Sequence, residues 1–344
     1  MLEIMRNLLV PAAATAALVL SAAGAAFAAP PVYKVQTKIK IGGAARWDYV
    51  YVDSTNHRLY VAHSGADAVE VIDTVADKVV ATIPNTKGVH GVAVANDLGK
   101  GYTSNGGSND VTIFDLKTSK PTGNVKTGQN PDSIIYEPTT HRVFTFNGKS
   151  NDSTVFDAKT GEIVSASLPL GGKPEFAQVD GKGHVYANLE DKNQIVEINA
   201  KDATVTKHYS IAPCDSPSGL AIDAKKNLLF SVCDGKTMVV SDPAAGKVVS
   251  TATIGEGVDG VAFDDGYAFS ANGKDGNITM VGESGGKYAA VATIPTQIRA
   301  RTIGADQSAH KLYLPTAEYG PADTKGGKGP QALPDSFEIL VVGR

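Results

Sequence analysis

The stretch RLYVAHSGADAVEVIDTVADKVVATI, from Arg58 to Ile83, decides the fold. It contains three short apolar runs, and Asp73 closes the second of them. Runs of this length that are rich in Val and interrupted by short polar segments are typical of β-strands. A lone three-stranded sheet has nothing to pack against, so the fold depends on whether this pattern recurs along the chain.

The pattern recurs seven times. Each copy has one aromatic residue at the same place in its second strand: Tyr60, Tyr102, Phe144, Tyr186, Phe230, Phe269 and Tyr313. The third strand ends in a short polar residue in five copies, namely Asp73, Asp115, Asp157, Asn199 and Asp242, which we expect to accept hydrogen bonds from turn amides. Repeats of about forty residues with four strands each predict a β-propeller. We therefore expect an all-β protein, a single seven-bladed β-propeller over residues 29–344 with four-stranded antiparallel blades.

Both ends of the repeat region are partial copies. The segment YKVQTKIKI, from Tyr33 to Ile41, resembles a fourth strand without its first three, whereas the last copy ends at a third strand, from Ser336 to Val342. Pairing these two segments would complete one blade from both ends of the chain and remove the open sheet edges. We expect the ring to close in this way, with an open β-solenoid as the alternative.

The repeat LYVAHSGADAVEVIDTVADKVVATI resembles that of the YVTN family of β-propeller proteins, which includes the YncE-like periplasmic proteins. The likeness covers nearly the whole chain after residue 28, although the Tyr-Val-Thr-Asn tetrapeptide is altered to LYVA in the first copy and GYTSN in the second. The resemblance implies a propeller fold and an exported protein. It narrows the activity little, because the family includes binding, surface-layer and cofactor-linked proteins.

Residues 1–28 are predicted to be a signal peptide. Arg6 precedes an apolar run, and the small residues around Ala28 fit a cleavage site. Met5 is an alternative start, because the sequence after it opens a signal peptide more cleanly. A membrane anchor is the other interpretation, but the run is short and Pro11 interrupts it. We expect a periplasmic or secreted protein with no membrane span after cleavage, and a monomer.

The composition excludes some partners and motifs. The net charge is -4, so the chain as a whole does not attract nucleic acid or an anionic membrane, and nucleic-acid binding is not expected. No motif of a serine hydrolase, zinc protease, haem site or phosphate-binding loop is present. The two cysteines, Cys214 and Cys233, map to one face of neighbouring strands, and we expect a disulfide between them.

The innermost strands of a propeller line a central channel. Aligning the seven copies places a polar residue at the second position of each such strand, with spacings of 41 to 43 residues: Asp48, His90, Asp132, Glu175, Ser218, Asp259 and Arg301. We expect these to surround one mouth of the channel, called here the top face. They either make up an ordinary wet rim or form a ligand site. Crowded carboxylates favour a bound cation, and His90, Asp132 and Glu175 are the predicted ligands of a divalent metal.

A second group is basic. Arg46, Arg299 and Arg301 are predicted to meet where blade seven joins blade one. They would either neutralise neighbouring carboxylates or bind an anionic ligand through paired hydrogen bonds. Trp47 lies beside them and is expected to pack at the blade junction, with stacking on a ligand as the alternative.

An insertion rich in Gly and Pro, residues 315–336, separates two strands of the last blade. Long loops of this kind are either inert or contact a partner, and Tyr319 is the one aromatic residue before the closing strand.

These observations lead to two hypotheses of function. The first is an exported, non-enzymatic module that binds a small molecule, peptide or protein at the top face and requires no cofactor. The alternative is a metal-assisted lactone or ester hydrolase, with the predicted metal ligands above, Asp259 or Asp48 as base, and Arg301 orienting the substrate. The sequence leaves both open.

Overall fold

A computed structural model of the protein describes residues 29–321 and 330–344. The predicted signal peptide, residues 1–28, and residues 322–329 of the predicted insertion lie outside this range. Residues Val32–Arg344 form one compact unit. Within the described range, no helix is both long and apolar enough to cross a bilayer.

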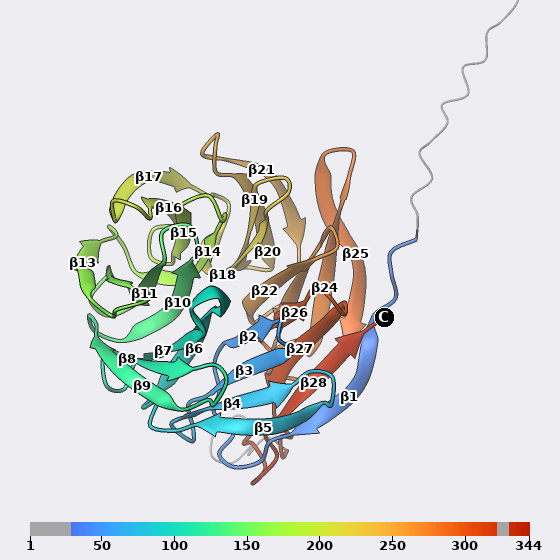
Figure 1. Ribbon diagram of the computed structural model, residues 1–344. Helices are drawn as coiled ribbons and strands as arrows, with labels where there is room; N and C mark the ends of the chain where they lie inside the picture. Colours follow the sequence, from blue (N-terminus) through green and yellow to red (C-terminus); the bar gives the residue numbers. More distant parts are fainter. Residues whose placement is uncertain (1–28, 322–329) are drawn as a thin grey trace, which may run out of the picture. The chain divides into compact units, whose positions relative to one another are not determined.

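Seven four-stranded antiparallel sheets stand around a central axis (Figure 1). The innermost strands contact one another in a closed circle and are β2 (Val50–Asp53), β6 (Val89–Ala95), β10 (Pro131–Glu137), β14 (Pro174–Val179), β18 (Asp215–Asp223), β22 (Val258–Asp264) and β26 (Gly304–Asp306). The second strands are β3 (Arg58–His63), β7 (Lys100–Asn105), β11 (Arg142–Asn147), β15 (His184–Leu189), β19 (Leu228–Asp234), β23 (Tyr267–Asn272) and β27 (Lys311–Thr316). A seven-bladed propeller is therefore confirmed.

The third and outer strands complete the blades. The third strands are β4 (Ala68–Asp73), β8 (Asp110–Asp115), β12 (Asp152–Asp157), β16 (Gln194–Asn199), β20 (Thr237–Asp242), β24 (Asn277–Ser284) and β28 (Glu338–Gly343). The outer strands are β5 (Lys78–Ile83), β9 (Pro121–Lys126), β13 (Ile163–Pro169), β17 (Thr204–Ser210), β21 (Lys247–Thr253), β25 (Lys287–Pro295) and β1 (Lys34–Lys40). A short 3₁₀ turn, η1 (Asn96–Leu98), follows β6.

The ring closes as the partial repeats predicted. The sheet of blade seven has the order β26-β27-β28-β1, so its outer strand comes from the start of the described chain. β1 runs antiparallel to β28, with Lys34 opposite Gly343 and Lys40 opposite Glu338. This pairing removes an open edge on each of the two segments.

The core lies between neighbouring blades. All seven repeated aromatic residues are buried, and each sits on a second strand. Tyr60 contacts Phe114 of the next blade at a ring-centroid distance of 5.7 Å, and Tyr102 contacts Phe156 at 5.8 Å. Burying one such ring contributes about 2–3 kcal/mol. The blades therefore supply the partner surface that the opening stretch lacks by itself.

The polar residues that end the third strands shape turns, as expected. The Asp73 carboxylate accepts hydrogen bonds from the amides of Val75 and Ala76. The equivalent carboxylate of Asp157 accepts them from Lys159 and Thr160. These residues act on the turn that leads into the outer strand, away from the top face.

The predicted disulfide is confirmed. Cys214, just before β18, is bonded to Cys233 in β19, with their Cα atoms 5.4 Å apart. The bond ties the entry of the innermost strand to its neighbour in blade five, near the top mouth of the channel.

Candidate functional site

The residues of the predicted rim lie in two kinds of backbone segment, innermost strands and the irregular segments that precede them. In five blades the residue lies within the innermost strand, as with His90 in β6 and Asp132 in β10. Asp48 and Arg301 instead lie in irregular segments ahead of β2 and β26. The Thr302 hydroxyl donates a hydrogen bond of 2.9 Å to the carbonyl of Asp48, which connects these two segments.

Three rim residues meet as a tight group, called here the acid–histidine cluster: Asp48, His90 and Asp132. His90 Nδ1 lies 2.5 Å from Asp48 Oδ2 and 3.6 Å from Asp132 Oδ1. The shorter contact is a charge-assisted hydrogen bond when the imidazole is protonated. One potential ligand atom from each residue lies within 4.8 Å of the others.

A glycine makes room for this imidazole. A Cβ atom at Gly106, in the turn after β7, would lie 2.5 Å from His90 Nε2. At the equivalent place in blade three, a Cβ at Gly148 would meet nothing closer than 3.7 Å. The first glycine of the sequence SNGGSND therefore serves the site as well as the turn.

Burial and mutual repulsion raise the pKa values of carboxyl groups in the rim. Burial, followed by the negative charge of Asp48, raises the pKa of Asp132 to about 7, although the nearby His90 opposes this. Burial and the charge of Asp132 raise the pKa of Glu175 to about 8. The rim thus holds more acid groups than its cations can keep ionised at neutral pH.

The remaining shifts agree with this picture. Burial lowers the pKa of His90, but the hydrogen bond that His90 donates to Asp48 and the charge of Asp132 outweigh this effect, so the pKa is raised overall. Burial raises the pKa of Asp259 to about 6, against the lowering effect of Arg301. A cation placed at the acidic side of the mouth would relieve these shifts.

Glu175 is not a member of the acid–histidine cluster. Its carboxylate lies 2.8 Å from Lys173 Nζ, and Lys173 also pairs with Glu190. The set of three that the sequence suggested as metal ligands therefore differs from the set that the structure brings together, in which Asp48 takes the place of Glu175. Sequence reasoning overlooked Lys173, whose position two residues before Glu175 puts both on one face of the chain.

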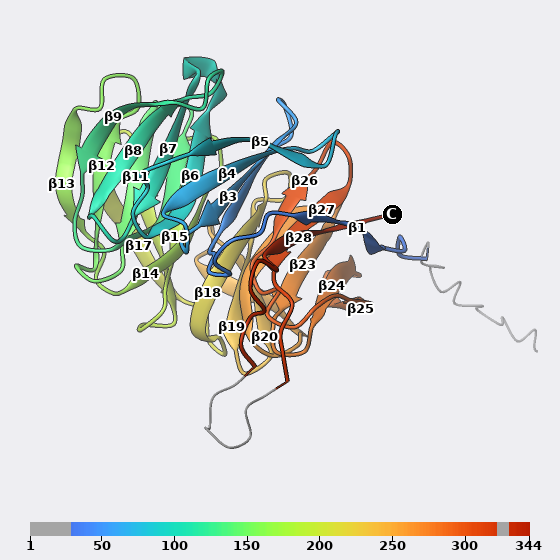
Figure 2. The same ribbon diagram turned by 90° about the horizontal axis from the view of Figure 1, so that it is seen from below.

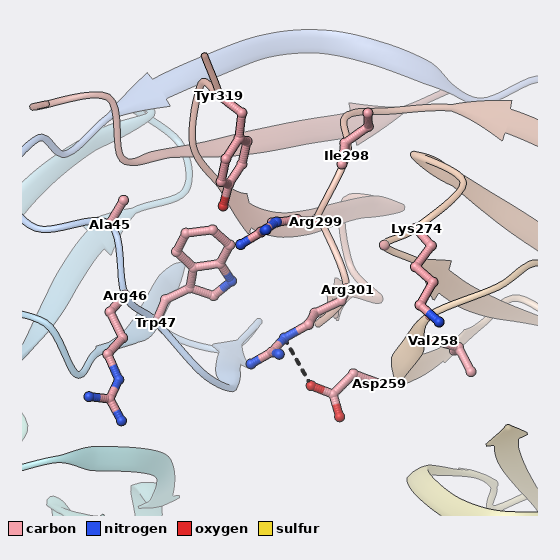
Figure 3. Close-up of a pocket in the computed structure, with 12 residues that line it drawn as sticks. Ala45, Arg46, Trp47, Val258, Asp259, Lys274, Ile298, Arg299, Arg301 and Tyr319 are labelled. Carbon is pink, nitrogen blue, oxygen red and sulfur yellow. Dashed lines mark ion pairs between the residues drawn. The ribbon is translucent and has the colours of Figure 1, made fainter. Parts of the chain in front are cut away.

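The predicted basic residues line a cavity of about 630 Å³ at the junction of blades six, seven and one (Figure 3). We call it the basic cavity; its described lining comprises Ala45, Arg46, Trp47, Gly257, Val258, Asp259, Gly273, Lys274, Ile298, Arg299, Arg301 and Tyr319. Four of these side chains are cationic, and only Asp259 is acidic. Arg301 Nε pairs with Asp259 Oδ2 at 3.1 Å.

The other three cations of the basic cavity are not neutralised. Arg46, Lys274 and Arg299 make no ion pair with any residue that the structure describes. Arg299 instead lies over the ring of Tyr319, 4.8 Å from its centroid. The cavity is therefore a site of uncompensated positive charge next to the acidic rim.

Trp47 is a core residue with one free donor. The indole is 8% exposed and stacks on Phe337 at 5.3 Å, as expected for a blade junction. Its Nε1 has no hydrogen-bond partner in the described part of the chain. Figure 3 shows this nitrogen on the side of the ring that faces Arg299 and Arg301. Three kinds of N–H donor thus converge on the basic cavity.

An aromatic pair crosses the channel below the rim. Tyr49 of blade one contacts Phe176 of blade four edge to face, with ring centroids 4.8 Å apart. Below this pair lies a cavity of about 210 Å³, lined mainly by innermost strands. Sequence reasoning missed the aromatic pair, although the equivalent position is Gly, Ser or Thr in the other five copies.

The Tyr49 side chain is 7% exposed, and its hydroxyl has no hydrogen-bond partner among the described residues. Burial raises the pKa of this hydroxyl well above its usual value, and four rim carboxyl groups raise it further: Asp132, Asp259, Glu175 and Asp48. All four rim carboxyl groups therefore act electrostatically on this hydroxyl.

The described ends of the insertion in blade seven pair with each other. The Gly320 amide donates to the Gln331 carbonyl at 3.0 Å, and the Leu333 amide donates to the Glu318 carbonyl at 2.7 Å. In Figure 2 these residues project from β27 and β28 beyond the ends of the strands. The pairing holds Tyr319 against the basic cavity.

Comparison with known proteins identifies the fold alone. No protein-family model and no curated protein sequence matches the chain. Among solved structures, Kuenenia stuttgartiensis hydrazine synthase is similar at 16% identity and a TM-score of 0.69, over 77% of this chain and 91% of that one. U3-55K and the WD40 repeats of RRP9 are each similar at 9% identity and a TM-score of 0.74 over 90% of this chain, covering 98% and 97% of their own. Together with its own sheets, these likenesses show that the chain is a seven-bladed β-propeller.

Proposed function

We propose that this propeller is a binding module that takes an anionic group into the basic cavity on its top face. The observation that carries the proposal is the excess of positive charge there, with Arg46, Lys274 and Arg299 unpaired within the described residues. Guanidinium groups bind carboxylate and phosphate through paired hydrogen bonds. Trp47 and Tyr319 supply flat apolar walls for the rest of the ligand.

The anionic group can belong to a small molecule or to an acidic or C-terminal residue of a peptide or protein partner. The cavity volume is in the range of small-molecule sites. Because an anion entering the cavity displaces no existing ion pair of Arg46 or Arg299, those cations are free to bind it.

The test is a titration of the full-length mature protein with small carboxylates and phosphates by isothermal calorimetry. Arg299→Ala should weaken binding at least about tenfold, which corresponds to about 1.4 kcal/mol. Lys78→Ala removes an exposed cation from the outer strand β5 and serves as the matched control. Equal affinities for wild type and Arg299→Ala would contradict the proposal, as would the absence of binding to any anion.

We further propose that the protein works outside the cytoplasm, as a YVTN-like exported propeller. The support is the apolar N-terminal sequence together with a buried disulfide, since structural disulfides persist in oxidising compartments. Cell fractionation followed by N-terminal sequencing tests this. A product that begins at Ala29 in the exported fraction is expected, and an uncleaved product in the cytosol would contradict it.

The second candidate function is metal-assisted ester or lactone hydrolysis, and the acid–histidine cluster favours it. Its mixed nitrogen and oxygen ligands suit a divalent cation. Against it, His90 Nδ1 already bonds to Asp48. Metal analysis of the purified protein decides between them, because less than about 0.1 equivalent of metal and no thermal shift with Ca²⁺, Mg²⁺, Zn²⁺ or Mn²⁺ would reject this candidate.

A further inference from the structure

The top mouth is divided by charge. One side is the basic cavity, with Arg46 and Arg299. The other is the acidic side, with Asp48, Asp132 and Glu175, and the Arg301–Asp259 ion pair belongs to both. The sides adjoin in the chain, because Arg46 and Trp47, which line the basic cavity, directly precede Asp48. A small ligand in the cavity can therefore extend from these residues toward Asp48.

Each side also has a polar atom that lacks a partner among the described residues, and the one on the basic side is buried. On the basic side it is the indole Nε1 of Trp47, a donor that faces the arginines. On the acidic side it is the hydroxyl of Tyr49, the residue directly after Asp48 in the chain. Buried polar groups are normally paired, so an unpartnered one in a binding site marks the place of a ligand atom.

An acidic rim repels a ligand that carries only negative charge. A carboxylate bound by Arg299 would lie next to Asp259 and near Asp48, and like charges at such distances oppose binding. A ligand that also carries an ammonium group turns this repulsion into attraction. An ammonium has three N–H donors, and carboxylates are acceptors that suit it.

We infer that the ligand is a zwitterion, an α-amino acid with an apolar side chain, whose carboxylate binds Arg299 and whose ammonium binds Asp48 and Asp132. The Tyr49 hydroxyl accepts a further hydrogen bond from the ammonium, and the Trp47 indole donates one to the carboxylate. The apolar side chain lies along Trp47 and Tyr319, which line the basic cavity. This inference rests on the proposed function and names its ligand class.

The test uses the mature protein and a set of matched probes. The common L-amino acids are first screened by thermal shift at millimolar concentration in the presence of a chelator. The best binder is then compared by calorimetry with its des-amino acid and its decarboxylated amine, for example phenylalanine, 3-phenylpropionate and 2-phenylethylamine. We expect the amino acid to bind at least tenfold more tightly than either analogue.

Two variants separate the ends of the ligand. Asp132→Asn should weaken binding of the amino acid at least tenfold. The same variant should strengthen binding of the des-amino acid, because a charge that repels its carboxylate has been removed. Arg299→Ala should weaken binding of both ligands. Circular dichroism and unfolding of each variant show that it is folded, and Asp202→Asn, an exposed carboxylate on an outer turn, is the control.

The outcomes are distinguishable. If the des-amino acid binds as tightly as the amino acid, the inference of a zwitterionic ligand is wrong and the anion-binding proposal stands. If no anion or amino acid binds, both fail. If binding occurs only when divalent metal replaces the chelator, the acidic side holds a metal and not an ammonium group, and the inference is overturned.

Discussion

His90 and Asp48 share a hydrogen bond of 2.5 Å although they are 42 residues apart in the chain. The contact joins the innermost strand of blade two to the irregular segment that enters blade one. It sets the acidic side of the top mouth, because the same imidazole nitrogen also lies 3.6 Å from Asp132. The first four predictions concern the acid–histidine cluster and residues next to it.

Asp48→Asn should lower the pKa of His90. The hydrogen bond and negative charge of Asp48 both stabilise the protonated imidazole, and burial alone would disfavour it. The measurement is a titration of the histidine resonances by NMR, assigned with His90→Gln. The other histidine resonances are the internal control, and an unchanged His90 titration would show that the hydrogen bond does not hold in solution.

The rim should make the protein less stable as pH rises. The pKa of Asp132 is raised to about 7 in the folded protein, so this group binds its proton more tightly there than in the unfolded chain. Its stabilising contribution is present at low pH and is lost between about pH 4 and pH 8.

Urea unfolding of wild type and Asp132→Asn at several pH values checks this sign. The variant should gain on the order of 1–3 kcal/mol relative to wild type as pH rises through this window. Asp202→Asn should keep the wild-type slope. A difference between Asp132→Asn and wild type that is constant with pH would contradict the prediction.

Gly106→Ala should displace His90. The added Cβ would lie 2.5 Å from His90 Nε2, so the imidazole or the turn must shift, at a cost of about 1–3 kcal/mol. Gly148→Ala, at the equivalent turn of blade three, has open space and should cost less. Thermal unfolding compares the two, and equal costs would show that the imidazole does not occupy this position.

Tyr49→Phe should leave the stability of the ligand-free protein nearly unchanged. The hydroxyl makes no hydrogen bond with a described residue, while the ring contact with Phe176 is preserved. Because this hydroxyl has no hydrogen bond to lose, removing it should cost little stability. Amino acid affinity should nevertheless fall several-fold, and unaltered affinity would remove this hydroxyl from the site.

Replacing Cys214 and Cys233 together by Ser should destabilise the protein by about 3 kcal/mol, as the chain-entropy model gives for a closed loop of this length. Guanidinium unfolding with and without reductant measures the loss. Reductant should affect wild type and leave the double variant unchanged, and a reductant effect on both would point to another cause.

The periodicity of the sequence was sufficient to predict the fold. Blades pack on blades through residues that recur in every copy, such as Tyr60 and Tyr102, so a one-dimensional repeat encodes the contacts directly. The closing of the ring through β1 and β28 and the disulfide followed from the same register. Sequence spacing also gave equivalent positions in the seven copies, five of which lie within innermost strands.

The division of the mouth was decided only by the tertiary structure. Asp48 reaches His90 because the chain before β2 is irregular, which the repeat pattern did not predict. Glu175 is drawn to Lys173 by a local ion pair that the alignment of seven equivalent positions concealed. Tyr49 meets Phe176 across the axis, between blades that share no repeat contact. Repetition encodes what every blade has in common, whereas a binding site depends on how unlike residues from different blades meet, and their distances and charges exist only once the ring has closed.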